Sequence, residues 1–538
     1  MKSYPQNRLY ICLPYMVLAG CTLIVFCVFI VDCPVYGAFL LTTDSFMHYI
    51  VMLLLLLLLL TYPLSVRSSC LGVADCNCEP VPGGSGQVIN CRNRDLTAVP
   101  TFDLAGSETQ YAELTLAGNR IASIPPRAFA GLQFRRLDLS DNPLDQLDAL
   151  AFSGLEQVLN ELSMSLSQGA EFPATAISPL TRLQILQVTG FTGRQLPSRA
   201  LSTLSELVEL WLTLGSLTAL NVEDLKAQRG SLQTLVLYGN ELSAVPTAAL
   251  SAATMLTTLD LSRNQVQSLP ADIFAGLVNL NVVDLSNNGL GGGGLDAAAF
   301  RGVGDRLRTL TMKSCQLGDR DVEALRQLHA VAELVMSYNS IANLPANLFN
   351  RMRSLRRLRL NNNRLQTITR SIFSSTSSTL EVLDLGHNPL SSVPVDAILD
   401  LNYLQELRLD GVTTIQLGVD SFTPQHHRVL RTLSVRGSGL GDRLWPIVSN
   451  LEGLNSLVAS ESSVSSIPDF SFRQNAALRT IDLSSNSISS LTQKSVYGLA
   501  GSLTAINLHG NSITTIHRCT FYGFRSVSLH TTVISATG

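Results

Sequence analysis

Four cysteines that lie close together could form disulfides or hold a metal ion: Cys70, Cys76, Cys78 and Cys91. They follow an apolar run, Tyr49–Leu60, which has the length of a signal-peptide core and is too short to span a bilayer comfortably. Cysteines clustered behind a secretory segment predict disulfides in an oxidising compartment. A zinc site is the competing interpretation, but the C-x5-C-x-C-x12-C spacing has no paired C-x2-C knuckles and no nearby histidines.

Other residue groups that could do chemistry have plainer interpretations. The glycine-rich stretch 289–296 lacks the Lys-Ser/Thr of a phosphate loop, so we expect a flexible loop at the rim of the fold. His426 and His427 have too few further ligands nearby for a metal site, which favours an exposed loop. The sequence has no recognisable nucleophilic triad and no H-E-x-x-H motif. It therefore predicts a non-enzymatic protein without a cofactor.

The basic stretch RMRSLRRLRLNNNRL (351–365) could be a nucleic-acid patch or a targeting signal. The whole chain, however, carries 38 basic and 41 acidic residues and a formal net charge of −3. A chain so close to neutral has no global field that attracts nucleic acid, and we expect no nucleic-acid partner. What the arginines do depends on the register of this stretch, which the rest of the chain sets.

The stretch belongs to a repeat. LRLNNNRLQTI at 358–368 has relatives such as LTLAGNRIASI at 114–124, LDLSRNQVQSL at 259–269 and INLHGNSITTI at 506–516. The pattern L-x-x-L-x-L-x-x-N-x-L recurs over 111–523, mostly every 24 or 25 residues, and gives about 17 repeats. Each L-x-L pair predicts a short strand, and no copy can bury its leucines alone. Stacked copies therefore predict a solenoid with a parallel sheet.

The repeat fixes which side chains point inward. It assigns Leu358 and Leu360 to the core and turns Arg357 and Arg359 outward onto the concave sheet. The repeat asparagine can satisfy backbone groups that the tight turn leaves unpaired. Ten asparagines hold this ladder position: Asn119, Asn142, Asn240, Asn264, Asn288, Asn339, Asn363, Asn388, Asn486 and Asn511. Cys315 stands at the same position, where a thiol is a known substitute.

These repeats resemble the leucine-rich repeat family, in particular the extracellular animal class with 24-residue repeats and an N-terminal cysteine cap. Members with this appearance include chaoptin- and connectin-like adhesion proteins, Toll-type receptor ectodomains, Slit-like ligands and the acid-labile subunit of serum. The resemblance covers residues 70–538. It implies an α/β solenoid, a leucine-rich repeat horseshoe with a parallel β-sheet on its concave face. It implies little about the specific role, because surface residues set function in this family.

The resemblance also implies how the cysteines pair. A cysteine-rich cap over residues 70–100 would join Cys70 to Cys78 and Cys76 to Cys91. The segment VINCRNRDLTAVP (88–100) resembles the capping strand that covers the leucines of the first repeat.

The two ends of the chain carry further expectations. We expect a signal peptide at 47–68 and an upstream extension at 1–46; a signal-anchor at 10–31, which would tether the protein to the membrane, is the alternative. Residues 524–538 break the repeat spacing, and we interpret them as a truncated repeat without a cysteine cap. A homodimer that covers this open end is the alternative to a chain that continues.

Partner-binding residues are expected on the concave face, at positions that flank the core leucines. Trp211, Val236 and Tyr238 form an aromatic corner there, and an exposed Trp–Tyr pair is a typical interface anchor. The alternative is a tryptophan folded over a degenerate repeat. The remaining candidates are Lys313, Tyr338, Arg357, Arg359 and Arg408. Acidic residues lie between the basic ones, which favours a ladder of ion pairs over an anion or glycosaminoglycan site.

The sequence thus predicts a non-enzymatic protein exported to the cell exterior that binds another protein. Cell-surface adhesion or recognition is the leading role. The ligand-binding ectodomain of a Toll-like signalling receptor and a secreted matrix or carrier protein are the alternatives.

Overall fold

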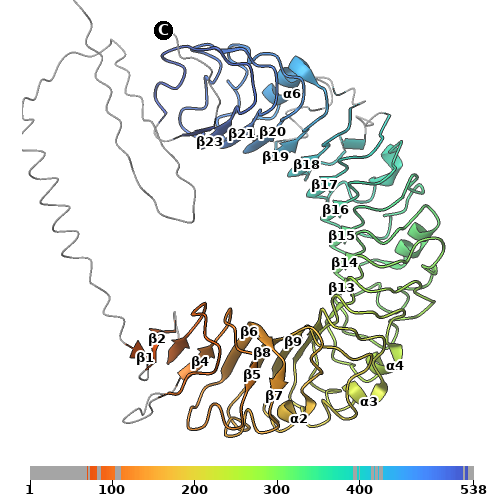
Figure 1. The fold of residues 1–538 in the computed structure, drawn as a ribbon. Helices are drawn as coiled ribbons and strands as arrows, with labels where there is room; N and C mark the ends of the chain where they lie inside the picture. The colour runs from red at the N-terminus through yellow and green to blue at the C-terminus, as the bar shows by residue number, and fades with distance from the viewer. Residues whose placement is uncertain are drawn as a thin grey trace, which may run out of the picture.

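A computed structural model describes residues 69–70, 73–81, 86–102, 111–391, 397–398, 400–413, 417, 422, 428–524 and 527–530. These residues form a curved solenoid whose strands line the inner side of an arc (Figure 1). The expectations for the upstream extension at 1–46, the signal peptide at 47–68, and the histidine pair at 426–427 lie outside the described residues.

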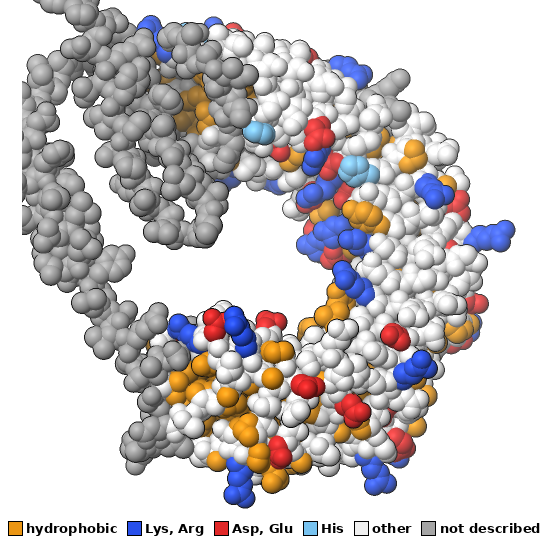
Figure 2. Space-filling view, in the orientation of Figure 1, with side chains coloured by type: hydrophobic (Ala, Val, Ile, Leu, Met, Phe, Trp, Pro, Cys, Tyr) orange, Lys and Arg blue, Asp and Glu red, His pale blue; other side chains and the backbone are white. Residues whose placement is uncertain are grey.

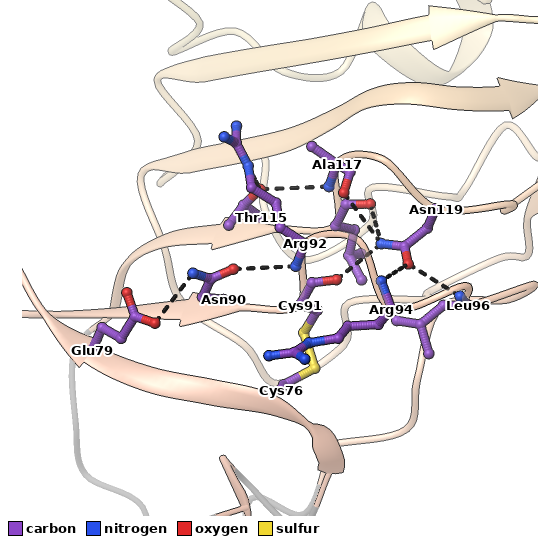
Figure 3. Close-up of a disulfide and its surroundings, with 11 residues drawn as sticks. Cys76, Glu79, Asn90, Cys91, Arg92, Arg94, Leu96, Thr115, Ala117 and Asn119 are labelled. Atoms are coloured by element: carbon purple, nitrogen blue, oxygen red, sulfur yellow. Dashed lines mark hydrogen bonds between the residues drawn. A yellow bond between two sulfur atoms is a disulfide. The ribbon is translucent and has the colours of Figure 1, made fainter. Parts of the chain in front are cut away.

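The N-terminal cap is a small antiparallel arrangement at the start of the sheet. Strand β1 (Ser69–Cys70) pairs with β2 (Val73–Pro80), and β2 pairs with β3 (Gln87–Asn90). A disulfide joins the buried Cys76 and Cys91, as the family resemblance implies (Figure 3). Cys78 is also disulfide-bonded. The side chain of Cys70 lies outside the described residues, so its pairing with Cys78 stays a prediction.

From β3 onward the strands pair parallel, one from each repeat, and build the concave sheet. Together with the cap strands they form one 21-stranded sheet. The strands after the cap are β4 (Tyr111–Thr115), β6 (Arg136–Leu144), β8 (Glu161–Leu166), β9 (Ile185–Thr189), β10 (Glu209–Thr213), β11 (Thr234–Val236), β12 (Thr258–Asp260), β13 (Val282–Asp284), β14 (Thr309–Thr311), β15 (Glu333–Val335), β16 (Arg357–Arg359), β17 (Val382–Asp384), β18 (Glu406–Arg408), β19 (Thr432–Ser434), β20 (Ser456–Val458), β21 (Thr480–Asp482), β23 (Ala505–Asn507) and β25 (Ser528–His530).

Short helices and turns return the chain on the outer side of the arc (Figure 1). The described elements there are α2 (Ala174–Ile177), α3 (Val222–Leu225), α4 (Thr247–Leu250), α6 (Leu444–Ser449) and the 3-10 turns η1 (Asp321–Gln327), η2 (Arg370–Ile372) and η4 (Gly441–Arg443). Two small parallel pairs complete them: β5 (Ser123–Ile124) with β7 (Gln146–Leu147), and β22 (Ser490–Leu491) with β24 (Thr515–Ile516).

The core is one continuous stack of leucines and phenylalanines between the sheet and the returning segments. Leu355, Leu358 and Leu360 are fully buried, in the register that the repeat predicts. The rings of Phe274 and Phe300, from neighbouring repeats, stack with their centroids 6.0 Å apart. Each repeat therefore buries its apolar side chains against its neighbours, which is how a solenoid without a closed core is stabilised.

The ladder asparagines connect adjacent repeats through the backbone. The Asn363 amide donates to the carbonyl oxygens of Met336 and Leu360, both at 2.9 Å, and its Oδ1 accepts from the Ile341 N–H at 3.1 Å. The same pattern holds for the other nine asparagines named above. At Cys315 the thiol takes over one donor role, toward the Leu285 carbonyl at 3.1 Å.

The glycine-rich stretch differs from its expectation, because the structure holds it against neighbouring repeats. A Cβ on Gly291 would lie 1.9 Å from the Gln316 carbonyl oxygen, and one on Gly294 would lie 2.2 Å from that of Gln267. The Gly294 carbonyl accepts a hydrogen bond from the Leu269 N–H at 2.7 Å. Glycine is thus required here for the close approach of backbones rather than for flexibility.

Candidate partner-binding face

The concave face presents the residues that flank the buried core residue of each strand. In β16, for example, Leu358 is buried while Arg357 and Arg359 point away from the core. Because the strands are in register, equivalent positions form rows that cross the whole sheet: Arg359 pairs with Val335 on one side and with Asp384 on the other. Side chains from repeats that are 24 or 25 residues apart are therefore direct neighbours.

The predicted aromatic corner is present, with one correction. Trp211 of β10 pairs with Val236 of β11, and Trp211 is half-buried with its Nε1–H donating to Glu209 Oε2 at 3.3 Å. Tyr238, just after β11, is also half-buried, and the Arg263 guanidinium lies 5.4 Å from its ring centroid. Val236 is only 5 % exposed, so its prediction as a partner-contacting residue is wrong.

Beside this corner lies a residue that the sequence analysis missed. Leu214 is 54 % exposed, and its N–H donates to the Tyr238 carbonyl at 2.8 Å. Its backbone is left-handed, with φ 50°. Tyr338, which is 50 % exposed with φ 59°, holds the equivalent place in the turn that follows β15.

Left-handed turn residues recur in the repeats, and most are glycine or polar. The turn row, defined as the left-handed residues that stand immediately before the ladder position, consists of Gly118, Asp141, Gly190, Leu214, Gly239, Arg263, Asn287, Ser314, Tyr338, Asn362, His387, Gly411, Gly437, Glu461, Ser485 and Gly510. Glycine adopts this conformation freely and asparagine tolerates it, whereas a leucine or tyrosine is strained there. Leu166 is also apolar at this position but is buried and not left-handed, so an apolar residue here does not by itself identify an exposed side chain such as Leu214.

Charged residues of strands β15, β16 and β18 form ion pairs on the concave sheet. Arg359 contacts Glu333 at 2.6 Å, Arg408 contacts Glu406 at 2.5 Å, and Figure 2 shows basic and acidic side chains side by side on the inner face. Lys313 is exposed, and its Nζ lies 4.8 Å from the Tyr338 ring centroid.

Within the charged region, Arg357 differs from Arg359 and Arg408 because it forms no ion pair with another described residue. It is exposed, and no hydrogen bond or ion pair to its guanidinium is found in the described part of the chain. Of the predicted basic residues, Lys313 and Arg357 are thus the two with charge available to a partner. Exposed pairs such as Arg359–Glu333 contribute little stability, and they leave less net charge for a ligand.

A pair of aspartates lies between the aromatic corner and the charged region. Asp260 of β12 and Asp284 of β13 are direct neighbours in the sheet. Burial raises the pKa of Asp284, and the charge of Asp260 adds to this effect, while hydrogen bonds from Ser286 oppose it. Sequence reasoning did not single out this pair, although the repeat register places the two residues side by side on adjacent strands.

The described residues offer little for catalysis or metal binding. They contain no group of three or more His, Cys, Asp and Glu side chains that could hold a metal ion. Burial raises the pKa of the Cys315 thiol to about 12, so it is not a nucleophile near neutral pH. The concave face can instead offer apolar anchors and charged groups to another macromolecule.

Comparison with known proteins identifies the repeat type. The family model described as leucine rich repeat matches four segments, at residues 230–290, 305–365, 353–412 and 452–513. The chain is 28 % identical to human Podocan-like protein 1 over 410 residues, which covers 70 % of this chain and 76 % of that protein. It is 27 % identical to Tsukushi of Gallus gallus over 214 residues, 35 % of this chain, and spans 56 % of that relative's length.

A solved structure supports the same fold. The Toll–Spatzle complex of Drosophila aligns with a TM-score of 0.53 and 19 % identity, over 84 % of this chain and 68 % of that one. Among the described residues, no helix is long and apolar enough to cross a membrane.

Proposed function

Because this chain is a leucine-rich repeat protein, we propose that it is a non-enzymatic recognition protein of the cell exterior that binds another protein with its concave face. One observation carries the proposal: Leu214 and Tyr338 are large apolar side chains held about half exposed in a left-handed backbone conformation. This conformation costs roughly 1–2 kcal/mol for a residue other than glycine. A partner that covers these side chains would offset that cost.

The aromatic corner and the charged residues of the concave face would contribute differently to binding. Trp211, Leu214 and Tyr238 form the apolar anchor, since aromatic side chains near the centre of an interface carry much of its binding energy. Lys313 and Arg357 would contact carboxylates of the partner and speed its approach. The ion-paired arginines would set orientation more than affinity, because their charges are already compensated.

The cap supports the proposed location. The Cys76–Cys91 disulfide suits an oxidising compartment, and the proposed place of action is the cell surface or the extracellular space. Within that setting, adhesion or recognition between cells is the proposed role, with a receptor ectodomain or a matrix protein as the alternatives.

The test measures binding of the full chain, attached to fluorescent beads, to intact cells and to other beads. The concave-face variant combines Leu214→Gly with Tyr338→Gly. Bead–cell binding should fall at least tenfold, because the apolar contacts are lost. The melting temperature should change by only a few degrees, since glycine suits the left-handed turn.

A matched control removes two exposed apolar side chains outside the concave strands, Leu150→Asn with Tyr403→Asn. The control should bind like the unchanged chain. Equal loss in both variants, or full binding by the concave-face variant, would contradict the proposal. Aggregation of coated beads with each other would indicate homophilic adhesion. Binding to cells together with a signalling response in cells that display the chain would favour the receptor role.

A further inference from the structure

The small sheet on the flank of the arc is interrupted between two neighbouring repeats. Strand β5 pairs with β7, as Ser123 does with Gln146. The next pairing at this level joins Glu171 to Thr192. Between Gln146–Asp148 and Gly169–Phe172, which the structure describes throughout, no backbone hydrogen bond is formed. The two segments diverge after the Ser167 N–H, which donates to the Leu144 carbonyl at 2.7 Å.

Backbone groups from both sides face this gap. The N–H of Asp148 donates to the Ile124 carbonyl at 3.1 Å, so the N–H and C=O of Leu147 point to the opposite side, because alternate residues of a strand face opposite neighbours. Likewise, the Thr192 N–H donates to the Ala170 carbonyl at 2.7 Å, and the backbone groups of Glu171 therefore point into the gap. Each side thus presents a free strand edge.

The space between these edges is a groove of about 750 Å³, which we call the flank groove. Its lining includes Pro125 and Leu147 on one side and Phe172 and Pro173 on the other. The volume lies within the range of ligand-binding clefts, roughly 300–1,000 Å³. Figure 2 shows hydrophobic surface and acidic side chains over this end of the arc.

The charges that line the groove are all negative: Asp145, Asp148 and Glu171. Asp148 accepts a hydrogen bond from the Leu150 N–H at 2.8 Å. The carboxylates of Asp145 and Glu171 are exposed, and no hydrogen bond or ion pair to them is found among residues 111–391. A ligand that complements this groove therefore carries positive charge.

We propose that the flank groove binds an extended peptide segment of a partner protein, carrying lysine or arginine, as an additional strand between β7 and Glu171. The free N–H and C=O groups of Leu147 and Glu171 would pair with the peptide backbone, as in other cases of strand addition. Its basic side chains would contact Asp145 and Glu171, and its apolar side chains would pack against the half-buried Leu147 and Pro173. This surface is separate from the concave face and goes beyond the function proposed above.

The probe is a fluorescent six-residue peptide that alternates valine and lysine, blocked at both ends, and binding to the full chain is followed by anisotropy at low ionic strength. Asp145→Asn with Glu171→Gln should weaken binding about tenfold through the loss of two ion pairs. The control variant Glu241→Gln with Glu452→Gln removes two exposed carboxylates elsewhere, for which the described part of the chain shows no hydrogen bond or ion pair, and should bind as before. A valine–glutamate peptide should not bind.

Two further measurements test the strand geometry. Peptide binding should slow amide hydrogen exchange at Leu147 and Glu171, and should change it little at Gln146 and Asp148, whose amides are already bonded to β5 and its flank. Methylation of alternate peptide nitrogens should abolish binding. Failure of the probe to bind, unchanged exchange at Leu147 and Glu171, or equal binding by the methylated peptide would overturn the proposal.

Discussion

The three consecutive asparagines 361–363 make the sharpest test of the repeat register. They are chemically identical, yet each has a different environment. Asn361 is half-buried just after β16, Asn362 is the left-handed turn residue with φ 56°, and Asn363 is buried in the ladder. We predict that Asn363→Ala is strongly destabilising, whereas Asn361→Ala costs less than about 1 kcal/mol, the typical net value of one partly exposed hydrogen bond.

The expected loss for Asn363→Ala follows from its three hydrogen bonds. The Met336 and Leu360 carbonyls each keep a second donor, from Asn339 and Asn388 respectively, so each loses only one of two partners. The Ile341 N–H, in contrast, loses the acceptor that Asn363 provides. A buried unpaired N–H costs about 1–3 kcal/mol, and two weakened carbonyls add about 1 kcal/mol. The total is about 2–4 kcal/mol.

Amide hydrogen exchange is the suitable assay, because a long repeat array does not unfold in one step and local stability is the relevant quantity. Exchange at Ile341 should accelerate about 30-fold to 700-fold in Asn363→Ala, which is the predicted free energy converted at tenfold per 1.4 kcal/mol. Exchange in the repeats near the N-terminal cap should be unchanged. Similar acceleration in Asn361→Ala, or none in Asn363→Ala, would refute the assignment of Asn363 to the ladder.

Three further predictions concern the core and the buried ionisable groups. Leu358→Ala should lower the local stability of its repeat by about 2–5 kcal/mol, measured by amide hydrogen exchange in that repeat and its neighbours, because it leaves a cavity in the core. Native Cys315 should resist iodoacetamide at pH 8 and react once unfolded, because burial raises its pKa to about 12. Folding raises the pKa of Asp284, so the stability of the folded state falls as the pH rises through that pKa. Asp284→Asn should therefore raise the melting temperature at pH 7 and not near pH 3.

The fold was predictable because every repeat carries the same local pattern of buried and outward residues. The alternation around Leu358 assigned inward and outward sides, and the buried leucine between two outward arginines matches that assignment. The family resemblance also implied the Cys76–Cys91 disulfide. The close packing of the glycine-rich stretch could not be predicted, because its glycines lie against the carbonyls of Gln267 and Gln316 in neighbouring repeats. Composition alone is equally consistent with flexibility.

The candidate site was predictable only in part. Flanking positions led to Trp211 and Tyr238, but the same reasoning included Val236, which is buried although it occupies an outward position. Leu214 was not predicted because it lies in the turn that follows β10, outside the strand positions that flank the core leucines. Exposure depends on the size of neighbouring side chains across the sheet, and a single repeat carries no information about that.

The repeat, its register and the side of the sheet on which each side chain lies can be read from the amino-acid sequence, because they follow from a period that is local in the chain. Contacts between repeats set which outward residues stay exposed, which arginines are compensated, and where the flank groove opens between β7 and Glu171. All of these depend on contacts between different repeats. Such contacts are set by how neighbouring turns stack or diverge, a property of pairs of repeats rather than of any one of them.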